Sequence, residues 1–429
     1  MELVTWTRGG RALAALSLGL LVGSGCKRSP TGAMCPIEPA TGPSPGAPTK
    51  IMQLVGDSDL ETSPPTPTRS LTATNVGLLG TDLGFSFVHR GKVWFLFGDS
   101  VAREPSAQRP KDSDAIAWSD AFVDAGADTA AGDRGFVLNF LTEPDALEPG
   151  KTAFQPVRLD GVALGTLELP TTGFSDGDAM YVFFVVKGKS ILATSRDEGR
   201  TFQTLVRVPT ERMVNIMPIV VPSADVPGAD TSSLQTVLMY GRQRQNAIVL
   251  AQAPLTRIAD ASSWRFASSA SDGTGWVTDG AAAAERVPAS CECNGNFSIT
   301  YVEGLGKWLM LNRCDEPHAI LLRTSRSVLG PWSEPRTFFD REGDRGTCRF
   351  MHKGCDPSAG NCCDDNFSPS LFDHWGPHED GFPYAPFPVA PYTRWDATSR
   401  TATLYFLLSV WNPYSPMLMR VRLPEASLP

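Results

Sequence analysis

Short apolar runs separated by polar turns dominate the chain, and residues 80–100, GTDLGFSFVHRGKVWFLFGDS, show this pattern most clearly. Two apolar runs, 85–88 and 93–97, flank the turn HRGK, and together they predict a β-hairpin. Because a hairpin returns the chain to its starting point, Asp82 and Asp99 should lie together at its open end. The sequence therefore predicts two carboxylates at one end of an apolar hairpin.

A hairpin followed by a third strand forms a unit that recurs along the chain. In the first copy the third strand is expected at 114–121. The later copies are expected at 170–188 with 191–202, 214–242 with 247–255, 296–313 with 319–335, and 384–414 with 416–423. A unit of this size has too small an apolar face to fold alone, so the copies must pack together in a ring or a stack.

Two turn motifs favour the ring. SRDEGRTF, residues 195–202, matches the Asp-box pattern of propeller blades, and SRSVLGPW, residues 325–332, is a blade turn that recurs in five-bladed glycosidases. We therefore expect an all-β, five-bladed β-propeller over residues 51–429, with its fourth strands in the weaker runs after each third strand. Residues 50–56 are expected to add an outer strand that closes the last blade. No segment longer than a turn has a helical pattern.

Composition narrows the classes of function. The chain has 38 Lys and Arg against 46 Asp and Glu, a net charge of −8, without a block of like charge. Neither nucleic acid nor an anionic membrane surface is therefore an expected partner. The 35 Pro and 39 Gly fit a turn-dense β protein. No phosphate-binding or dinucleotide-binding glycine loop is present, so we expect no cofactor, and we expect a monomer.

The N-terminal segment has the layout of an export signal. Arg8 and Arg11 precede the apolar run 12–23, which is too short to span a bilayer. Cys26 follows small residues, as in a bacterial lipoprotein signal, so residues 1–26 predict a cleaved signal with Cys26 lipidated. The alternatives are an ordinary signal peptide cut nearby, or a Cys26 that forms a disulfide. Residues 27–50, rich in Pro, Gly, Ser and Thr, predict a flexible tether, and thus an exported lipoprotein of the bacterial cell envelope.

Most of the other cysteines fall in one region of the chain. An even number of cysteines in an exported protein favours disulfides. We expect these disulfides to staple a cysteine-rich insert, at about residues 340–366, to the propeller. A zinc site is the alternative, but the spacings lack the usual two-residue knuckle, so we expect no metal. Cys35 is the expected odd partner, and the clustered cysteines are Cys291, Cys293, Cys314, Cys348, Cys355, Cys362 and Cys363.

Several stretches together resemble a bacterial family of exported five-bladed propellers catalogued as a domain of unknown function, DUF4185. They are residues 80–100, TSRSVLGPW (324–332), YAPF (384–387) with TRWD (393–396), and LLSVWNPYSPMLMRVRL (407–423). The resemblance covers about residues 60–423, and the cysteine-rich stretch 348–363 departs from the family pattern. Some members are endo-acting D-arabinanases. The resemblance therefore implies a glycoside hydrolase that acts on a furanose-containing, D-arabinan-like polysaccharide.

Propeller geometry separates the candidate site residues from turn residues. The start of each first strand and the end of each second strand share the face where a funnel converges on the axis. Candidate carboxyls there are Asp82, Asp99 and Glu168, and candidate sugar-binding residues are Asn215, Tyr240, Arg242, Asn296, Tyr384, Trp411 and Asn412. The acids at hairpin turns, Asp176, Asp178, Glu303 and Asp396, are expected to be solvated, and Asp197 to be the structural acid of the Asp-box.

Glycosidic bond cleavage needs one protonated and one ionised carboxyl group, held at different pKa values by their surroundings. Related five-bladed glycosidases carry their base on the innermost strand of the first blade, and Asp82 matches that position. The alternative for Asp82 is a structural role, in which it hydrogen-bonds neighbouring first strands. For the whole protein, the alternatives to a hydrolase are a non-catalytic surface glycan-binding propeller and a structural lipoprotein.

Overall fold

The structure is a computed structural model of the chain. It describes residues 48–59, 64–106, 109–110, 113–120, 136–210, 213–242, 247–268, 275–287, 293–314, 319–340, 383–410 and 413–429. Cys26 with the expected signal, nearly all of the cysteine-rich insert, Trp411 and Asn412 lie outside the described residues.

Within the described residues, five antiparallel sheets of four to six strands form the body of the fold, beside two two-stranded ribbons. The first contains β4 (Leu78–His89), β5 (Lys92–Ala102), β6 (Ser113–Ser119) and β7 (Asn139–Phe140), and the second contains β10 (Leu169–Ser175), β11 (Met180–Val186), β12 (Lys189–Ser195) and β13 (Gln203–Arg207). The third contains β14 (Val214–Pro222), β15 (Gln235–Arg242), β16 (Ile248–Pro254), β17 (Arg265–Ala267) and β18 (Trp276–Val277), with β19 (Glu285–Val287) paired to β16. The fourth contains β20 (Cys293–Val302), β21 (Lys307–Cys314), β22 (Ala319–Ser325) and β23 (Arg336–Asp340). The fifth contains β24 (Tyr384–Pro388), β26 (Thr401–Val410), β27 (Ser415–Pro424) and β1 (Thr49–Gln53), with β25 (Arg394–Asp396) paired to β26.

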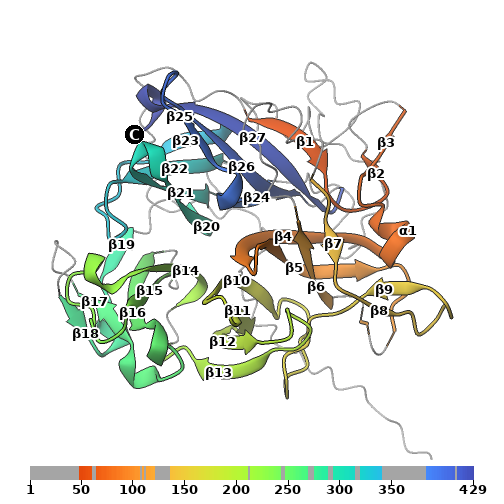
Figure 1. The fold of residues 1–429 in the computed structure, drawn as a ribbon, viewed down its shortest axis with the longest axis horizontal. Helices are drawn as coiled ribbons and strands as arrows, with labels where there is room; N and C mark the ends of the chain where they lie inside the picture. The colour runs from red at the N-terminus through yellow and green to blue at the C-terminus, as the bar shows by residue number, and fades with distance from the viewer. Residues whose placement is uncertain are drawn as a thin grey trace, which may run out of the picture. The chain divides into compact units, whose positions relative to one another are not determined.

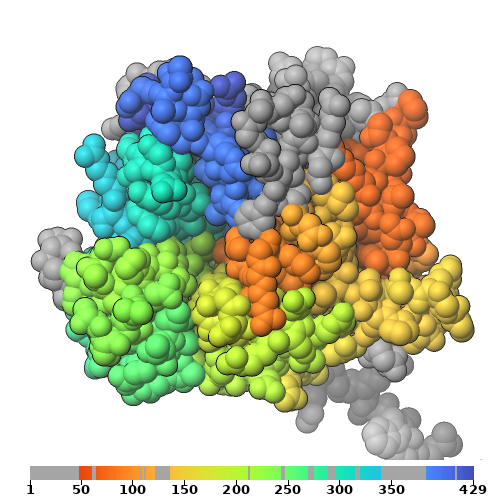
Figure 2. Space-filling model, viewed as in Figure 1, coloured from red at the N-terminus to blue at the C-terminus, as the bar shows by residue number. Residues whose placement is uncertain are grey.

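The sheets are the blades of a closed propeller. Each innermost strand contacts the innermost strand of the next blade, in the order β4, β10, β14, β20 and β24, and β24 contacts β4 again. Figure 1 shows the five blades arranged around a common axis, and Figure 2 shows neighbouring blades in contact around the ring. The predicted five-bladed, all-β architecture is therefore confirmed.

The ring is closed by the N-terminal strand. β1 pairs with β27, with Thr49 opposite Arg420, and so becomes the outer strand of the last blade. The predicted closing strand is confirmed, although it begins at Thr49, inside the segment assigned to the tether. Leu54 and Val55, which follow β1, are buried in the core between the first and last blades, and this burial anchors the strand.

Apolar faces of adjacent blades supply the core. One cluster joins the first and last blades, a second joins the fourth and fifth, and a third joins the second and third. The first cluster includes Phe95 and Phe97 of β5 and Leu407 of β26. The alternating apolar positions that predicted the strands are the ones that face the next blade.

The hairpin and Asp-box turns follow their local sequences. Arg90 and Gly91, between β4 and β5, have φ of 47° and 76°, as expected for a two-residue hairpin turn. In the Asp-box, Asp197 accepts hydrogen bonds from the Ser195 hydroxyl (2.7 Å) and from the Thr201 amide (3.0 Å) and hydroxyl (2.6 Å). Phe202, its aromatic residue, is fully buried. The expected structural role of Asp197 is confirmed.

Helical structure is minor within the described residues. The α-helix α1 (Thr72–Val76) has five residues, slightly more than the single turn that the sequence suggested. The 3-10 turns are η1 (Ser223–Asp225), η2 (Leu255–Arg257), η3 (Ala261–Ser263), η4 (Gly280–Ala282), η5 (Glu303–Leu305), η9 (Ala390–Tyr392) and η10 (Glu425–Ser427), and two small ribbons pair β2 (Ser58–Asp59) with β3 (Thr66–Pro67) and β8 (Thr142–Pro144) with β9 (Thr152–Phe154). None of the described helices could cross a bilayer.

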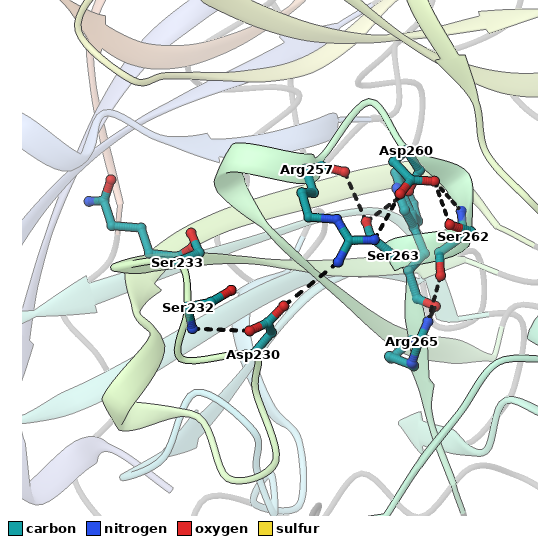
Figure 3. A network of polar contacts seen from close by, with 10 residues as sticks. Asp230, Ser232, Ser233, Arg257, Asp260, Ser262, Ser263 and Arg265 are labelled. Atoms are coloured by element: carbon teal, nitrogen blue, oxygen red, sulfur yellow. Dashed lines mark hydrogen bonds and ion pairs between the residues drawn. The ribbon is translucent and has the colours of Figure 1, made fainter.

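A polar network holds the outer corner of the third blade (Figure 3). Arg257 bonds Asp260 at 2.9 Å and lies 3.8 Å from a carboxylate oxygen of Asp230. Asp260 also accepts the Ser262 amide at 2.9 Å and so caps η3. Arg257 therefore links the connection between β16 and β17 to Asp230 in the connection between β14 and β15.

Candidate active site

Every innermost strand has a break in its pairing near its start. The register of β4, β10, β14, β20 and β24 against the second strand of each blade shifts there. In three of these strands the break includes a non-glycine residue with positive φ: Leu83 (65°), Asn215 (50°) and Ala385 (52°). Such bulges turn side chains out of the sheet plane, and they concentrate next to active sites. The bulged ends therefore mark one face of the ring as the candidate site.

Asp82 is the buried carboxyl of this face. It lies in β4 opposite Gly98 of β5, and 3% of its surface is exposed. Gly98 leaves the space that this carboxyl fills, because a Cβ there would lie 3.2 Å from Asp82 Oδ1. The Tyr384 hydroxyl donates a hydrogen bond to Asp82 Oδ2 over 2.7 Å. Oδ1 is shielded from solvent and accepts no hydrogen bond of normal geometry from the described residues.

The surroundings of Asp82 favour its protonated form. Burial and then the negative charge of Asp99 raise the pKa of Asp82 well above that of an exposed aspartate. Hydrogen bonding to the Tyr384 and Tyr414 hydroxyls opposes this shift, but it is the smaller effect on the pKa. A neutral carboxyl next to an ionised one is the combination that acid–base chemistry on a glycosidic bond requires.

Asp99 is held in an unusual backbone conformation. Its φ is 43°, and it lies where the pairing of β5 with β6 breaks between Phe97 and Ser100. Its amide donates to Asp114 Oδ1 (3.2 Å), and its own Oδ1 accepts the Leu167 amide (3.3 Å). Asp99 is 8% exposed. The predicted proximity of Asp82 and Asp99 agrees with the effect of the Asp99 charge on Asp82.

Tyr384 joins the last blade to this site. It begins β24, is 2% exposed, and has the guanidinium carbon of Arg313 at 5.9 Å from its ring centroid. Burial, followed by the charge of Asp82, raises the pKa of Tyr384 well above its usual value, so its hydroxyl remains a donor. Tyr384 is one of the sugar-binding residues predicted for this face. The structure adds the hydrogen bond to Asp82.

Two predicted site residues have other contacts. Glu168 precedes β10, and its two oxygens accept the amides of Lys187 (2.8 Å) and Gly165 (3.3 Å), so its carboxylate holds a loop. Tyr240 of β15 is fully buried, and its hydroxyl donates to the Val328 carbonyl in the turn of the fourth blade. These contacts favour structural roles for both residues.

Three other predicted residues keep their place on the site face. Asn215 lies in the bulge of β14, Arg242 ends β15 and is buried, and Asn296 is buried near the start of β20. Trp411 and Asn412 lie outside the described residues, so their predicted role is not tested.

Three residues of this face were not among the predicted site residues: Tyr414, Arg313 and Asp114. The Thr81 amide donates to the Tyr414 carbonyl at 3.2 Å, which places Tyr414 beside the strand that carries Asp82, and Tyr414 lowers the pKa of Asp82. Tyr414 lies within a stretch that carried the family resemblance, and Arg313 and Asp114 lie at the ends of predicted strands. Each of these residues therefore lies in or beside a predicted segment, but the contact that gives the residue a role depends on the bulges.

Cys314 ends β21 and is disulfide-bonded. The side chains of the other predicted partners lie outside the described residues, so the pairing of the clustered cysteines stays a prediction. Among the described residues, no cluster of side chains has the composition of a metal site.

Comparison with known proteins assigns the family. Residues 68–420 match the family described as domain of unknown function DUF4185. The chain belongs to the DUF4185 family. The matched span includes Asp82, Asp99, Tyr384 and Tyr414. No curated protein matches this DUF4185 chain significantly.

Solved structures are similar to this DUF4185 protein at low sequence identity. A provisionally named hydrolase from Bacteroides ovatus is 12% identical, with a TM-score of 0.50, over 82% of this chain and 87% of that chain. An α-L-arabinofuranosidase from Podospora anserina, in complex with cellotriose, is 10% identical, with a TM-score of 0.46, over 89% and 98%. A family 117 glycoside hydrolase from Zobellia galactanivorans is 9% identical, with a TM-score of 0.41, over 88% and 90%. At 12% identity, the similarity to the Bacteroides ovatus protein concerns the fold alone.

Proposed function

We propose that this protein is a glycoside hydrolase in which Asp82 is the general acid and Asp99 the ionised carboxylate. The observation that carries the proposal is the environment of Asp82, a buried carboxyl beside a second carboxylate at the bulged end of the innermost strand. A buried carboxyl of raised pKa keeps its proton to higher pH than an exposed aspartate does, and it can donate that proton to a leaving group. The family resemblance suggested the base role for Asp82, whereas its electrostatics favour the acid role.

Tyr384 fixes one oxygen of the acid. Oδ2 of Asp82 accepts a hydrogen bond from the Tyr384 hydroxyl. In the reaction, Asp82 gives its proton to the glycosidic oxygen as the bond from that oxygen to the anomeric carbon breaks, and the bonding electrons stay on the oxygen. Asp82 is left as a carboxylate that the Tyr384 and Tyr414 hydroxyls stabilise.

Asp99 completes the reaction from the other side of the bond. Its carboxylate either takes a proton from an attacking water, which inverts the anomeric configuration, or adds to the anomeric carbon and is later displaced by water, which retains it. NMR of the first product formed distinguishes the two outcomes.

We propose a furanose-containing polysaccharide of the D-arabinan type as the substrate. The support is the resemblance to a family with endo-acting D-arabinanases, together with amide and guanidinium side chains on the site face. Asn215, Arg242 and Asn296 are of the types that hold sugar hydroxyls, and they come from the third and fourth blades. We also propose that the protein is exported, anchored by a lipid on Cys26, and monomeric.

A glycan-binding propeller without catalysis is the second candidate. The observation in its favour is that Asp82 and Asp99 are both nearly closed to solvent, and that the Tyr384 bond ties the first blade to the last. Under this alternative, Asp82 supports the ring and the face binds a glycan through aromatic and amide side chains.

Digestion of a glycan panel with product analysis tests the proposal. The wild type should release oligosaccharides from arabinan, and Asp82→Asn and Asp99→Asn should each slow release by ~10²-fold while the folded fraction is preserved. Binding without cleavage by the wild type would favour the glycan-binding propeller. Cleavage that neither substitution slows would refute the placement of the site.

A further inference from the structure

Asp114 is a buried acid that neither carboxyl role accounts for. It lies in β6 of the first blade and is 3% exposed. Its Oδ1 accepts the amide of Asp99 at 3.2 Å. A carboxylate that binds a backbone amide in a buried strand is placed to fix the conformation of that backbone.

The backbone at Asp99 needs such support. Asp adopts a left-handed φ more readily than most non-glycine residues, but a bulge removes the ladder hydrogen bonds that would otherwise hold the strand. Where β5 and β6 lose register, the Asp114 carboxylate takes the place of a backbone carbonyl as acceptor for the Asp99 amide. Without this acceptor, the amide would be buried unsatisfied or the bulge would relax.

The bulge sets the direction of the Asp99 side chain. With its amide bound to Asp114, the Asp99 carboxylate accepts the Leu167 amide at 3.3 Å and raises the pKa of Asp82. The other groups that act on Asp82 are Tyr384 of β24 and Tyr414, which follows β26. A relaxed bulge would swing the Asp99 carboxylate away from this set.

We propose that Asp114 is a positioning residue that holds Asp99 in its working orientation beside Asp82. The inference rests on the proposed function, because it gives Asp114 a role in the same reaction. Asp114 acts through the backbone of Asp99, by the position of its carboxylate oxygen rather than by its charge.

Two substitutions separate position from charge. Asp114→Asn keeps an oxygen acceptor at the same distance but removes the charge. Asp114→Glu keeps the charge but moves the oxygen by one methylene, and Asp114 forms part of the wall of a cavity of about 530 Å³ that can take the longer side chain. We expect Asp114→Asn to stay within ~3-fold of the wild-type kcat, and Asp114→Glu to lose ~10- to 100-fold in kcat with KM little changed, as misplacement of a reacting group does.

The pH profile provides a readout that loss of stability alone would not change. If Asp99 moves away, its charge no longer raises the pKa of Asp82, so Asp82 loses its proton at lower pH. The alkaline limb of kcat/KM should therefore move to lower pH in Asp114→Glu and stay in place in Asp114→Asn. The matched control is Asp176→Glu, because Asp176 also accepts backbone amides, from Asp178 (2.9 Å) and Ala179 (2.8 Å), but at a hairpin turn. This control should leave the profile unchanged.

A titration that does not need activity separates this proposal from the proposed function. Carbon-13 NMR of the Asp82 carboxyl, assigned by its loss in Asp82→Asn, should show a lower pKa in Asp114→Glu than in the wild type and Asp114→Asn. If no glycan is cleaved but this shift occurs, the proposed function fails and the positioning of Asp99 stands. An Asp114→Asn protein that is impaired while Asp114→Glu works, or an unchanged Asp82 pKa in folded Asp114→Glu, would overturn the positioning role.

Discussion

The Tyr384 hydroxyl, on the innermost strand of the last blade, donates a hydrogen bond to Asp82 on the innermost strand of the first, over 2.7 Å. The two residues are 302 positions apart in sequence. This contact crosses the seam where the ring closes, and it holds one oxygen of a carboxyl whose pKa is raised. It therefore connects closure of the fold to the proposed chemistry.

Replacement of Asp82 by asparagine should separate catalysis from stability. We expect Asp82→Asn to reduce turnover by ~10²-fold or more, because a positioned proton donor is lost. Stability should not fall at neutral pH, because the folded protein no longer carries a buried carboxyl that resists ionisation. Kinetics and melting temperature measured on the same preparation test both expectations.

The raised pKa of Asp82 determines whether its contribution to stability grows or falls with pH. The pKa of Asp82 is raised in the folded state, so this group stabilises the fold fully below the unfolded pKa of about 4 and loses that contribution as pH rises through the folded pKa. Within that window the loss is about 1.4 kcal/mol per pH unit. The melting temperature of Asp82→Asn relative to wild type should therefore rise with pH. A variant that melts well below wild type at every pH would show instead that Asp82 holds the ring closed.

Tyr384→Phe should shift the pH profile of kcat/KM in the direction opposite to the shift expected when the Asp99 carboxylate moves away from Asp82. The hydroxyl stabilises the charged form of Asp82, so its removal raises the pKa of Asp82 further, and the alkaline limb of kcat/KM should move to higher pH. Loss of one hydrogen bond to a carboxyl should cost about tenfold in kcat. Tyr392→Phe is the matched control, because Tyr392 is a buried tyrosine of the same blade that packs in the apolar core. An unchanged limb in Tyr384→Phe would mean that Asp82 does not set it.

The fold could be predicted from sequence because its signals are local. Alternating apolar positions defined the hairpins, the Asp-box at Asp197 defined a blade turn, and the apolar run after Thr49 defined the closing strand. The site could be predicted only in part. Strand order places Asp82, Asp99 and Tyr384 at one face, whereas the roles of Asp114 and Tyr414 depend on where the pairing breaks, which no residue pattern reports.

Tyr240 shows the same limit of a sequence pattern. It sits near the funnel end of its strand, but its ring faces the fourth blade and packs at 6.1 Å from Trp332 between ring centroids. Side chains alternate between the two faces of a strand, so a position near the correct end of a strand does not by itself direct a side chain toward the axis.

The lipid anchor is testable without activity. If Cys26 is lipidated, the protein will partition into detergent and incorporate a fatty-acid probe, because one acyl chain adds a large apolar surface. Cys26→Ser should lose both properties, while Cys35→Ser, a cysteine in the same tether, should keep them. Equal probe labelling of wild type and Cys26→Ser would rule the anchor out.

Glu168→Gln tests which carboxyl accompanies Asp82. Both oxygens of Glu168 accept backbone amides, of Lys187 and Gly165, so this carboxylate is engaged in holding the loop that leads to β10. Glutamine retains one acceptor and turns an NH₂ group toward the other amide, so we expect a lower melting temperature with kcat within ~3-fold of wild type, since a structural hydrogen bond contributes only about 1 kcal/mol. Asp99→Asn, assayed beside it, should lose ~10²-fold in kcat. If Glu168→Gln loses that much at an unchanged melting temperature while Asp99→Asn stays active, Glu168 is the second carboxyl and Asp99 only shapes the bulge.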